Sequence, residues 1–323
     1  MINVDIFTRE GLKPARVEDL PELLKKDDTI VWIDIDNPMS GDIDYVGQLL
    51  DFHPLAIEDT RNDYQRPKVE EYHQHLFIII NSFGINREDR TLSIEELDIF
   101  LGRNFVVTAH HHAMNCLRQA RERMMRERAF RHESSEFVFY VILDVIVDGY
   151  FPAIEYLETQ IANIEDRIIH NPSQDILSDI LELKRVTSEV VRITAYQENM
   201  FGVITRHQRD LFVNHDILNY YLRDVHDHLI KTHSMSVTAA ETLTALVNLY
   251  MSSTSNRLNL VVNRLTIATI IIGVFTVVSG FYGMNFERTF PPYEAEWGLP
   301  VAVAGMVIAA LIILAYFRSR KMI

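Results

Sequence analysis

The sequence predicts an α+β cytoplasmic domain, built as an α/β/α sheet sandwich, followed by a very long stalk helix and two transmembrane helices. Three observations support this prediction. Short runs rich in Val, Ile and Phe fill the first third of the chain, a long stretch without glycine or proline follows, and two uncharged apolar runs occupy residues 265–286 and 297–317. Each run can cross a bilayer, because about 20 apolar residues in a helix span the hydrocarbon core.

Residues 1–112, the first predicted domain, mix strands with short helices. Short runs of branched and aromatic side chains bounded by Gly, Asn or Pro are typical of strands. Five such runs occur, at residues 2–7, 29–35, 76–83, 92–101 and 105–109. A helical pattern lies between them at residues 43–52.

Residues 113–264, the second predicted region, are expected to form long helices. Pro152 is expected to kink or restart a helix. Between Gly202 and Gly273, 70 residues contain neither glycine nor proline, whereas globular helices average about 11 to 12 residues. This predicts one very long helix, on the order of 100 Å at 1.5 Å per residue, or a tight helical pair. From Ser234 onward we expect the helix to run unbroken into the first apolar run.

Residues 265–323, the third predicted region, form a two-helix hairpin in the membrane. Basic residues flank it on the outer sides, at Arg257, Arg264, Arg318, Arg320 and Lys321. The connecting loop holds one basic residue and an acidic set, Glu287, Glu294 and Glu296. Because cytoplasmic flanks carry the excess of Lys and Arg, we expect an integral protein of the cell (inner) membrane with both termini cytoplasmic and the acidic loop outside.

The charge balance separates the possible partners. The net charge is −14 at pH 7. Residues 264–323 carry +2, so residues 1–263 carry −16. This argues against nucleic acid, whose phosphates require a basic surface. It favours a domain that meets cations, although an acidic surface also simply keeps a protein soluble.

Motifs for enzyme chemistry are absent from the sequence. It contains no nucleophile elbow, HExxH or nucleotide-binding loop, so we expect neither an enzyme nor an organic cofactor. The single cysteine, Cys116, excludes an intrachain disulfide and a cysteine-based zinc framework.

The helix expected to contain the first apolar run carries a stripe of small and polar residues at helical spacing, which begins with three asparagines directly before that run. Its members are Asn256, Asn259, Asn263, Thr266, Thr269, Gly273, Thr276, Gly280 and Gly283. Such a stripe permits close helix packing in lipid, or it forms the wet wall of a pore made by several copies of one helix. Unpaired amides and hydroxyls are costly against lipid, which favours the pore. A pore of this kind requires a homo-oligomer around an axis.

The chemistry of this stripe suits a hydrated cation. Residues 265–286 contain no carboxylate, histidine or cysteine, so they offer amide, hydroxyl and backbone oxygens, which bind an ion weakly enough to release it. Mg²⁺ suits such weak binding because it loses its hydration waters only at a high energetic cost. Without an ATPase motif, the driving force is the gradient itself, and the membrane potential supplies a divalent cation with about 4.6 kcal/mol per 100 mV.

Three segments resemble one known family. Tyr282-Gly283-Met284-Asn285, at the end of the first apolar run, resembles the YGMN signature of the CorA family of divalent-cation channels. Residues 53–72, HPLAIEDTRNDYQRPKVEEY, and 221–229, YLRDVHDHL, also resemble the family. The likeness covers nearly the whole chain. It implies a funnel-shaped homopentamer that admits Mg²⁺, with Co²⁺ and Ni²⁺ as accompanying substrates.

The resemblance also implies roles for individual residues. Gly283, Met284 and Asn285 would form a selectivity ring at the outer mouth. Asn259 and Thr276 match polar pore-lining positions, and Val262 and Leu265 match an apolar constriction. Gly273 lies where relatives carry a bulkier apolar residue, which puts a second constriction there in doubt. Stripe and resemblance agree at 259, 273, 276, 280 and 283 and differ by one residue at 262 and 265.

A regulatory site follows from the same resemblance. Asp59 and Asp224 match an acidic pair that binds cytoplasmic Mg²⁺ across the subunit boundary, with Glu58, Asp144 and Asp148 as neighbours at a second site. Facing carboxylates repel one another when empty and are bridged by a bound dication. Occupancy would therefore hold the subunits together and the pore shut.

Two alternatives remain open. The thirteen histidines, among them the run at 110–112 and the pairs at 73 and 75 and at 226 and 228, leave room for a zinc transporter of the same superfamily. On a helix, however, residues i and i+2 do not face each other, so His226 and His228 cannot easily chelate one ion. The alternative of another class is a membrane-anchored cation sensor that conducts nothing.

Overall fold

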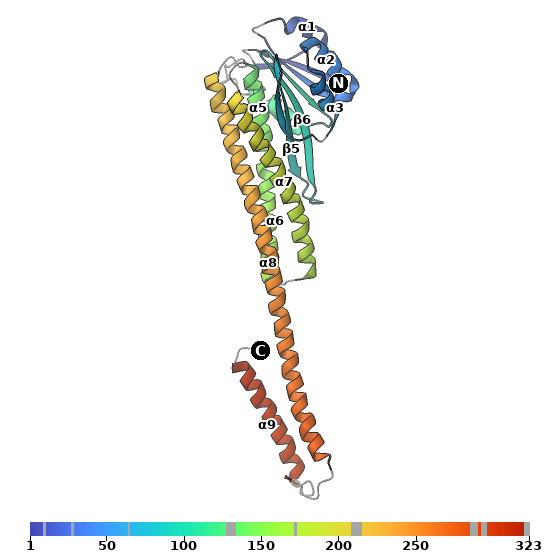
Figure 1. The fold of residues 1–323 in the computed structure, drawn as a ribbon, viewed down its shortest axis with the longest axis vertical. Helices are drawn as coiled ribbons and strands as arrows, with labels where there is room; N and C mark the ends of the chain where they lie inside the picture. The colour runs from blue at the N-terminus through green and yellow to red at the C-terminus, as the bar shows by residue number, and fades with distance from the viewer. Residues whose placement is uncertain are drawn as a thin grey trace. The chain divides into compact units, whose positions relative to one another are not determined.

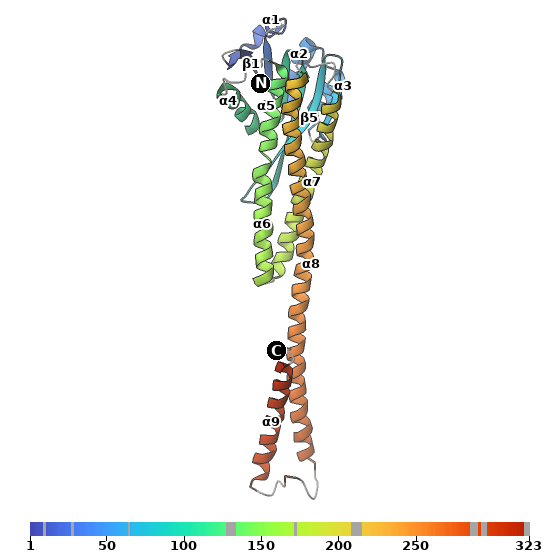
Figure 2. The same ribbon diagram turned by 90° about the vertical axis from the view of Figure 1, so that its left-hand side faces the viewer.

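The computed structural model describes residues 1–8, 11–26, 29–63, 65–126, 134–170, 173–207, 215–284, 290–291 and 296–319. The chain forms two compact units. Unit 1 comprises Met1–Asp166 and Asp175–Leu246, and unit 2 comprises Arg167–Gln174 and Val247–Ile323. Figures 1 and 2 show the elements of each unit from two sides.

A seven-stranded sheet organises unit 1, in the order β2-β1-β3-β7-β6-β5-β4. The strands are β1 (Ile2–Thr8), β2 (Gly11–Ala15), β3 (Ile30–Asp36), β4 (Lys68–Glu71), β5 (His75–Ile85), β6 (Leu92–Gly102) and β7 (Phe105–His110). Strands β3 and β7 pair in parallel, and every other neighbouring pair is antiparallel. All five predicted strands are confirmed.

The two strands that the sequence analysis missed, β2 and β4, lie at the two edges of the sheet. Strand β2 contains Pro14, and β4 reads Lys-Val-Glu-Glu. Edge strands tolerate proline and charge because one side of their backbone is not paired within the sheet. Their sequences therefore lack the alternating apolar signal that identifies the inner strands.

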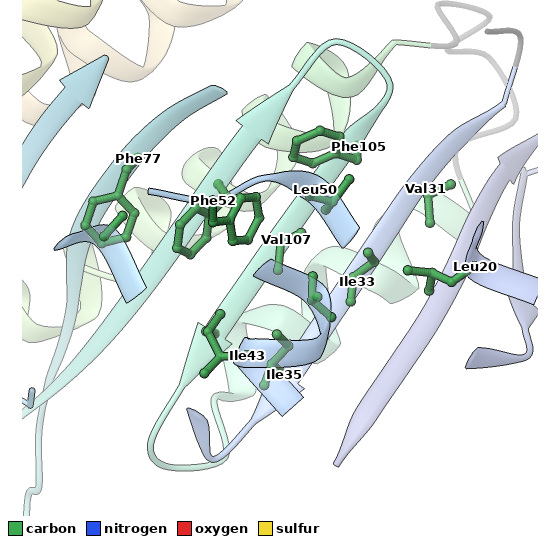
Figure 3. Packing of buried hydrophobic residues seen from close by; sticks show 14 of the residues in the cluster. Leu20, Val31, Ile33, Ile35, Ile43, Leu50, Phe52, Phe77, Phe105 and Val107 are labelled. Carbon is green, nitrogen blue, oxygen red and sulfur yellow. The ribbon is translucent and has the colours of Figure 1, made fainter. Parts of the chain in front are cut away.

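Short helices cover one face of the sheet. They are α1 (Leu20–Leu23), α2 (Asp42–Leu50) and α3 (Pro54–Arg61), with 3₁₀ turns at Val17–Asp19 and Pro38–Ser40. Side chains of β3 pack under α2 and Phe52, as Figure 3 shows. The ring of Phe52 stacks on Phe100 with centroids 3.9 Å apart. The side chains between these helices and the sheet form an apolar core.

Longer helices complete unit 1. They are α4 (Asn115–Arg126), α5 (Ser135–Asp148), most of α6 (Phe151–His170), α7 (Gln174–His207) apart from its first residue, and the first part of α8 (His215–Tyr282). Helix α5 ends at Asp148 and α6 begins at Phe151. Pro152 thus lies in a first helical turn, where its missing N–H costs no hydrogen bond, and the predicted restart is confirmed.

Helix α8 contains 68 residues, which corresponds to about 100 Å at 1.5 Å per residue. The stretch without glycine and proline holds the end of α7 at His207 and the start of α8 at His215. A helical pair and one very long helix are therefore both present. The predicted unbroken run from Ser234 into the apolar segment is confirmed.

Three helical segments are long and apolar enough to cross a membrane. The apolar window of Ser135–His170 is 78% buried inside the protein, whereas those of Tyr220–Phe281 and of α9 (Gly298–Ser319) are 6% and 11% buried. A buried apolar helix has its partners within the chain. The two exposed windows instead require an apolar covering, and both belong to unit 2.

Candidate functional site

Four side chains of unit 1 lie close together in a group that we call the acidic cluster: Asp144, Asp148, Asp224 and His228. Helix α5 presents Asp144 and Asp148 one turn apart, and α8 presents Asp224 and His228 in the same way, because residues i and i+4 share a helix face. One ligand atom from each of Asp144, Asp224 and His228 lies within 4.8 Å of the others. The distance from His228 Nδ1 to Asp148 Oδ1 is 3.4 Å.

The cluster combines burial with negative charge. Asp144 is only 4% exposed, and its carboxylate pairs with Arg123 of α4. Burial, followed by the charge of Asp144, raises the pKa of the Asp148 carboxyl. The same two causes, in the same order, raise the pKa of Tyr140 to about 12. Burial is the larger cause of both shifts, and the negative charge of Asp144, which a bound cation would neutralise, is the second.

The donor set fits a divalent cation. Carboxylate oxygens suit Mg²⁺, which keeps several of its waters and takes one or two carboxylates. The imidazole of His228 adds a ligand suited to Co²⁺, Ni²⁺ or Zn²⁺. Within the described ranges, no other group of three or more His, Cys, Asp and Glu side chains brings its ligand atoms together in this way.

The sequence analysis named three members of the cluster, considered His228 only as a partner of His226, and did not name Arg123. The i, i+4 spacing of Asp224 and His228 was the signal that could have placed His228 in the cluster. Those two histidines do point apart. The ring of His226 stacks near Phe201, with centroids 6.5 Å apart, whereas His228 meets Phe151 at 5.8 Å.

The other histidine groups do not assemble into a metal site among the described residues. His110 Nε2 lies 3.3 Å from Asp34 Oδ1, and His111 Nε2 lies 3.2 Å from the carbonyl oxygen of Thr60. His75 is buried beside Phe52, and this burial lowers its pKa to about 4. These histidines have structural environments of their own.

Asp59 and Glu58 lie on α3, away from the contacts that define the acidic cluster. Asp59 Oδ2 accepts a hydrogen bond from Lys68 Nζ at 2.6 Å, and Lys68 also reaches Glu70 Oε1 at 2.8 Å. Glu58 is exposed. The resemblance assigns the contact between Asp59 and Asp224 to two different subunits, so it stays a prediction here.

The predicted stripe lies on α8 in unit 2, with its threonines and glycines at exposed positions. Partial or full burial recurs at Ile267, Ile271, Val274 and Val278, which marks the packed side of α8, and α9 is the helix drawn beside this part of α8 in Figures 1 and 2. At about 100° per residue, Thr276 and Gly280 lie on the opposite side. Asn259, Gly273, Thr276 and Gly280 are all exposed.

Two glycines of the stripe leave open space. A Cβ added at Gly273 or Gly280 would meet no atom within 4 Å. These glycines are therefore not needed for packing α8 against α9. Close helix packing, if it explains the stripe, must involve a second copy of the chain.

The threonines of the stripe satisfy their own hydroxyls. Thr266, Thr269 and Thr276 each donate to the carbonyl four residues earlier, at 2.9, 2.9 and 2.8 Å. The expectation that their hydroxyls are unpaired, and so costly in lipid, is therefore wrong. The polar argument for a pore depends on the asparagine amides, while the threonine oxygens keep lone pairs for a passing ion or its water.

The stripe and the family resemblance differ by one residue at positions 262 and 265, and the structure bears on these positions. Val262 and Leu265 are 58% and 67% exposed and lie, by helical rotation, on the same side as Thr276 and Gly280. Asn263 is half-buried and turns toward the α9 side. Thr266 is exposed like Leu265, so the structure distinguishes the two sets of positions only at Val262 and Asn263, and the pore-lining roles stay a prediction.

The end of α8 is described as far as Met284. The N–H of Gly283 donates to the carbonyl oxygens of Ser279 and Gly280 at 2.9 and 3.2 Å, and Met284 N–H donates to Phe281 at 3.2 Å. Glu296 is exposed. The predicted residues Asn285, Glu287 and Glu294 lie outside the described residues.

Comparison with known proteins identifies similar chains over nearly the full length. A family model described as CorA-like Mg²⁺ transporter protein matches residues 27–320. The cobalt/magnesium transport protein CorA of Thermotoga maritima is 29% identical over 324 residues, covering 99% of this chain and 92% of its own. The putative metal ion transporter YfjQ of Bacillus subtilis is 29% identical, covering 97% and 95%.

A solved structure shares the fold. The complete structure of the CorA magnesium transporter from Methanocaldococcus jannaschii matches with a TM-score of 0.78 and 19% identity, covering 98% of this chain and 97% of that one. At this identity the match supports the arrangement of sheet, long helix and apolar helices, and the family model carries the functional inference.

Proposed function

Because this chain belongs to the CorA-like Mg²⁺ transporter family, we propose that it is a magnesium channel or transporter that admits Mg²⁺ passively, driven by the membrane potential. Co²⁺ and Ni²⁺ are further substrates in this proposal. The observation that carries it is the uncharged face of α8, which α9 leaves exposed and on which Gly273 and Gly280 leave open space.

The proposed assembly is a funnel-shaped homopentamer in the cell (inner) membrane. One chain offers two exposed apolar helices, the end of α8 and α9, and two helices cannot enclose a pore. Several copies of α8 around an axis supply the wall that one chain lacks. Residues 1–112 and 113–264 are the cytoplasmic domain and stalk, residues 265–323 form the pore domain, and both termini are cytoplasmic.

The proposed pore passes a hydrated ion. Gly283, Met284 and Asn285 form the selectivity ring, and oxygens of Asn259 and Thr276 meet the ion below it. Apolar Val262 and Leu265 form a constriction that closes by excluding water. Their exposed position opposite α9 supports this assignment.

The proposed gate responds to cytoplasmic Mg²⁺, which is both the transported and the regulatory ion. Mg²⁺ bound at the acidic cluster, and between Asp59 and Asp224 of adjacent subunits, neutralises facing carboxylates and holds the pore shut. Glu58 contributes an exposed carboxylate to the same surface. Loss of the ion restores the repulsion and opens the pore.

Ion flux in proteoliposomes tests this function. The full-length chain is reconstituted with a Mg²⁺ indicator inside, and a negative internal potential is imposed. We expect uptake that grows with the potential, and loss of selectivity in Asn285→Ala. Absence of divalent flux at both low and high internal Mg²⁺ would indicate a non-conducting sensor, and strong Zn²⁺ uptake without Mg²⁺ uptake would indicate a zinc transporter.

A further inference from the structure

We propose that Arg123 is a built-in competitor for the metal at the acidic cluster: its guanidinium holds the Asp144 carboxylate until a divalent cation displaces it. Arg123 thereby sets the cation concentration to which the cluster responds. This inference rests on the proposed role of the cluster as a regulatory metal site.

One carboxylate serves both cations. Asp144 is buried, and its Oδ2 atom forms an ion pair with Arg123 Nη1. The same side chain supplies one of the three ligand atoms that lie within 4.8 Å of one another. Arg123 is also hydrogen-bonded to Tyr140, one turn before Asp144 on α5. A metal ion that binds Asp144 therefore meets a site already occupied by a positive charge.

The charges of the cluster determine whether Arg123 favours the metal-free or the metal-bound state. Three carboxylates, Asp144, Asp148 and Asp224, accompany one arginine, so acidic groups outnumber Arg123 in the cluster. Without metal, Arg123 compensates the buried Asp144, which would otherwise be a costly unpaired charge. With a dication present, the guanidinium repels it at close range. The arginine thus stabilises the empty state and opposes the filled one.

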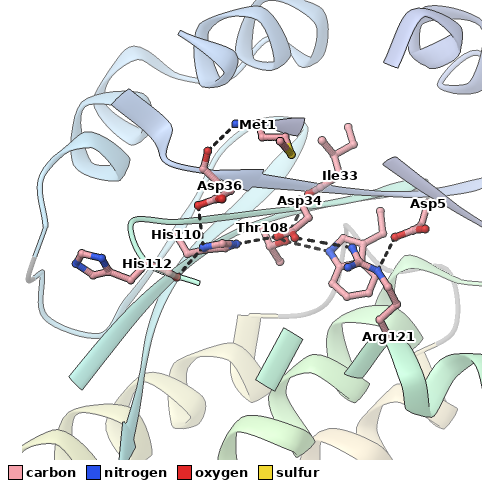
Figure 4. A network of polar contacts seen from close by, with 10 residues as sticks. Met1, Asp5, Ile33, Asp34, Asp36, Thr108, His110, His112 and Arg121 are labelled. Atoms are coloured by element: carbon pink, nitrogen blue, oxygen red, sulfur yellow. Dashed lines mark hydrogen bonds and ion pairs between the residues drawn. The ribbon is translucent and has the colours of Figure 1, made fainter. Parts of the chain in front are cut away.

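A second arginine fixes the helix that carries the competitor. Arg121, two residues earlier on α4, points to the sheet, where its Nε donates to Asp5 Oδ2 at 2.8 Å (Figure 4). Its Nη2 lies 3.8 Å from Asp34 Oδ2, and its guanidinium lies over Trp32, 4.8 Å from the ring centroid. With α4 anchored in this way, Arg123 stays within reach of Asp144 at a constant effective concentration.

Calorimetric titration of the full-length chain in detergent micelles with Mg²⁺ and with Co²⁺ tests the proposal. In Arg123→Gln we expect binding about tenfold tighter, because a nearby positive charge is removed. Arg123→Lys keeps the charge without the planar fork and should lie between the two. Arg118→Gln is the matched control, since Arg118 lies on the same helix, 65% exposed and paired with Glu122, and its removal should leave affinity unchanged.

Thermal unfolding keeps the test informative if the substitution weakens the fold. Without metal, Arg123→Gln should unfold at a lower temperature than the wild type, and Mg²⁺ should raise that temperature by more than it does in the wild type. If Arg123→Gln does not fold, Arg123→Lys, with its looser pairing, should still bind Mg²⁺ more tightly than the wild type.

The outcomes separate this inference from the proposed function. Weaker or unchanged metal affinity in the folded Arg123 variants, with Asp144→Asn weakening binding, would overturn the competitor and leave the regulatory site in place. Unchanged affinity in Asp144→Asn would overturn the regulatory site, and with it the competitor. Mg²⁺ flux in proteoliposomes reports on the transport function independently of both.

Discussion

The acidic cluster and the exposed face of α8 treat a cation in opposite ways. In the cluster, charged side chains from two helices converge on one point, and Asp144 is almost fully buried. On α8, uncharged residues such as Thr276 and Gly280 line one open side. Charge and burial suit a site that holds an ion, whereas neutral oxygens along an open wall suit one that lets it pass.

The two regions also differ in whether one chain supplies every group that the proposed function needs. The cluster assembles its ligand atoms within one chain, within 4.8 Å of one another. The face of α8 has no partner opposite Gly273 and Gly280 among the described residues. One region can therefore be tested in a single subunit, and the other acquires its function only in an assembly.

The largest expected effect comes from filling the open face. Gly280→Phe places a large ring where a Cβ meets no atom within 4 Å in one chain, but where the proposed pore has its axis. We expect Mg²⁺ flux in proteoliposomes to fall by about a thousandfold, since a blocked pore excludes the hydrated ion. Gly305→Phe on α9, which has equally open surroundings, is the control and should conduct. Flux through Gly280→Phe at the wild-type level would remove α8 from the pore wall.

Neutralising the cluster should have the next largest effect. In the double variant Asp144→Asn and Asp224→Asn, we expect Mg²⁺ affinity to fall by about a hundredfold, because two of the charged ligands are lost. Calorimetric titration measures this. Asp227→Asn, exposed on the same helix, should bind normally. A double variant with wild-type affinity would place the regulatory ion elsewhere.

A buried carboxylate outside the cluster should respond to pH rather than to metal. Burial raises the pKa of Glu96 to about 7 despite a hydrogen bond from the Gln65 backbone, and the charges of Asp63 and Asp59 raise it further. Because the folded pKa exceeds the unfolded one, this contribution to stability is present below about pH 4.5 and is lost as the pH rises through 7. In Glu96→Gln, the free energy of unfolding should therefore fall by about 2 kcal/mol less than in the wild type between pH 5 and 8.

Denaturant unfolding across this pH range, with and without Mg²⁺, tests the contrast. The stabilisation by Mg²⁺ should be the same in Glu96→Gln as in the wild type. If the substitution removed the Mg²⁺ effect, the separation between the metal-binding cluster and a buried acid outside it would fail.

The smallest effect is expected at Thr276. Its hydroxyl already donates to the carbonyl of Ile272, so Thr276→Val removes only an acceptor oxygen from the wall. We expect Mg²⁺ flux to fall by about threefold, because the remaining oxygens still solvate the ion. Thr276→Ser retains the oxygen and should be neutral. A complete loss of flux in Thr276→Val would mean that this hydroxyl binds the ion directly and strongly.

Local patterns predicted much of the fold. The inner strands β1, β3, β5, β6 and β7 and the continuity of α8 follow from composition and periodicity within short windows. The order of the sheet does not, because the parallel pairing of β3 with β7 joins segments about 70 residues apart. Edge strands β2 and β4 were missed because proline and charge are tolerated there.

The candidate sites show the same division. The stripe on α8 was predictable because helical periodicity is local, but the side covered by α9 emerges only from Ile267 and its neighbours in the structure. Within the cluster, the carboxylates came from the family resemblance. His228 lies one helical turn after Asp224, a spacing visible in the sequence, whereas Arg123 joins the cluster through packing between α4 and α5, which no single window of sequence contains.

Mg²⁺ uptake by proteoliposomes with high internal Mg²⁺ most directly tests whether one region holds the ion and the other passes it. The measurement compares the wild type with the double variant Asp144→Asn and Asp224→Asn under the same imposed potential. We expect the wild type to conduct only when internal Mg²⁺ is low, and the double variant to conduct at both levels. A double variant that remains closed at high internal Mg²⁺, or that conducts at neither level, would contradict the claim that the acidic cluster holds the ion and the face of α8 passes it.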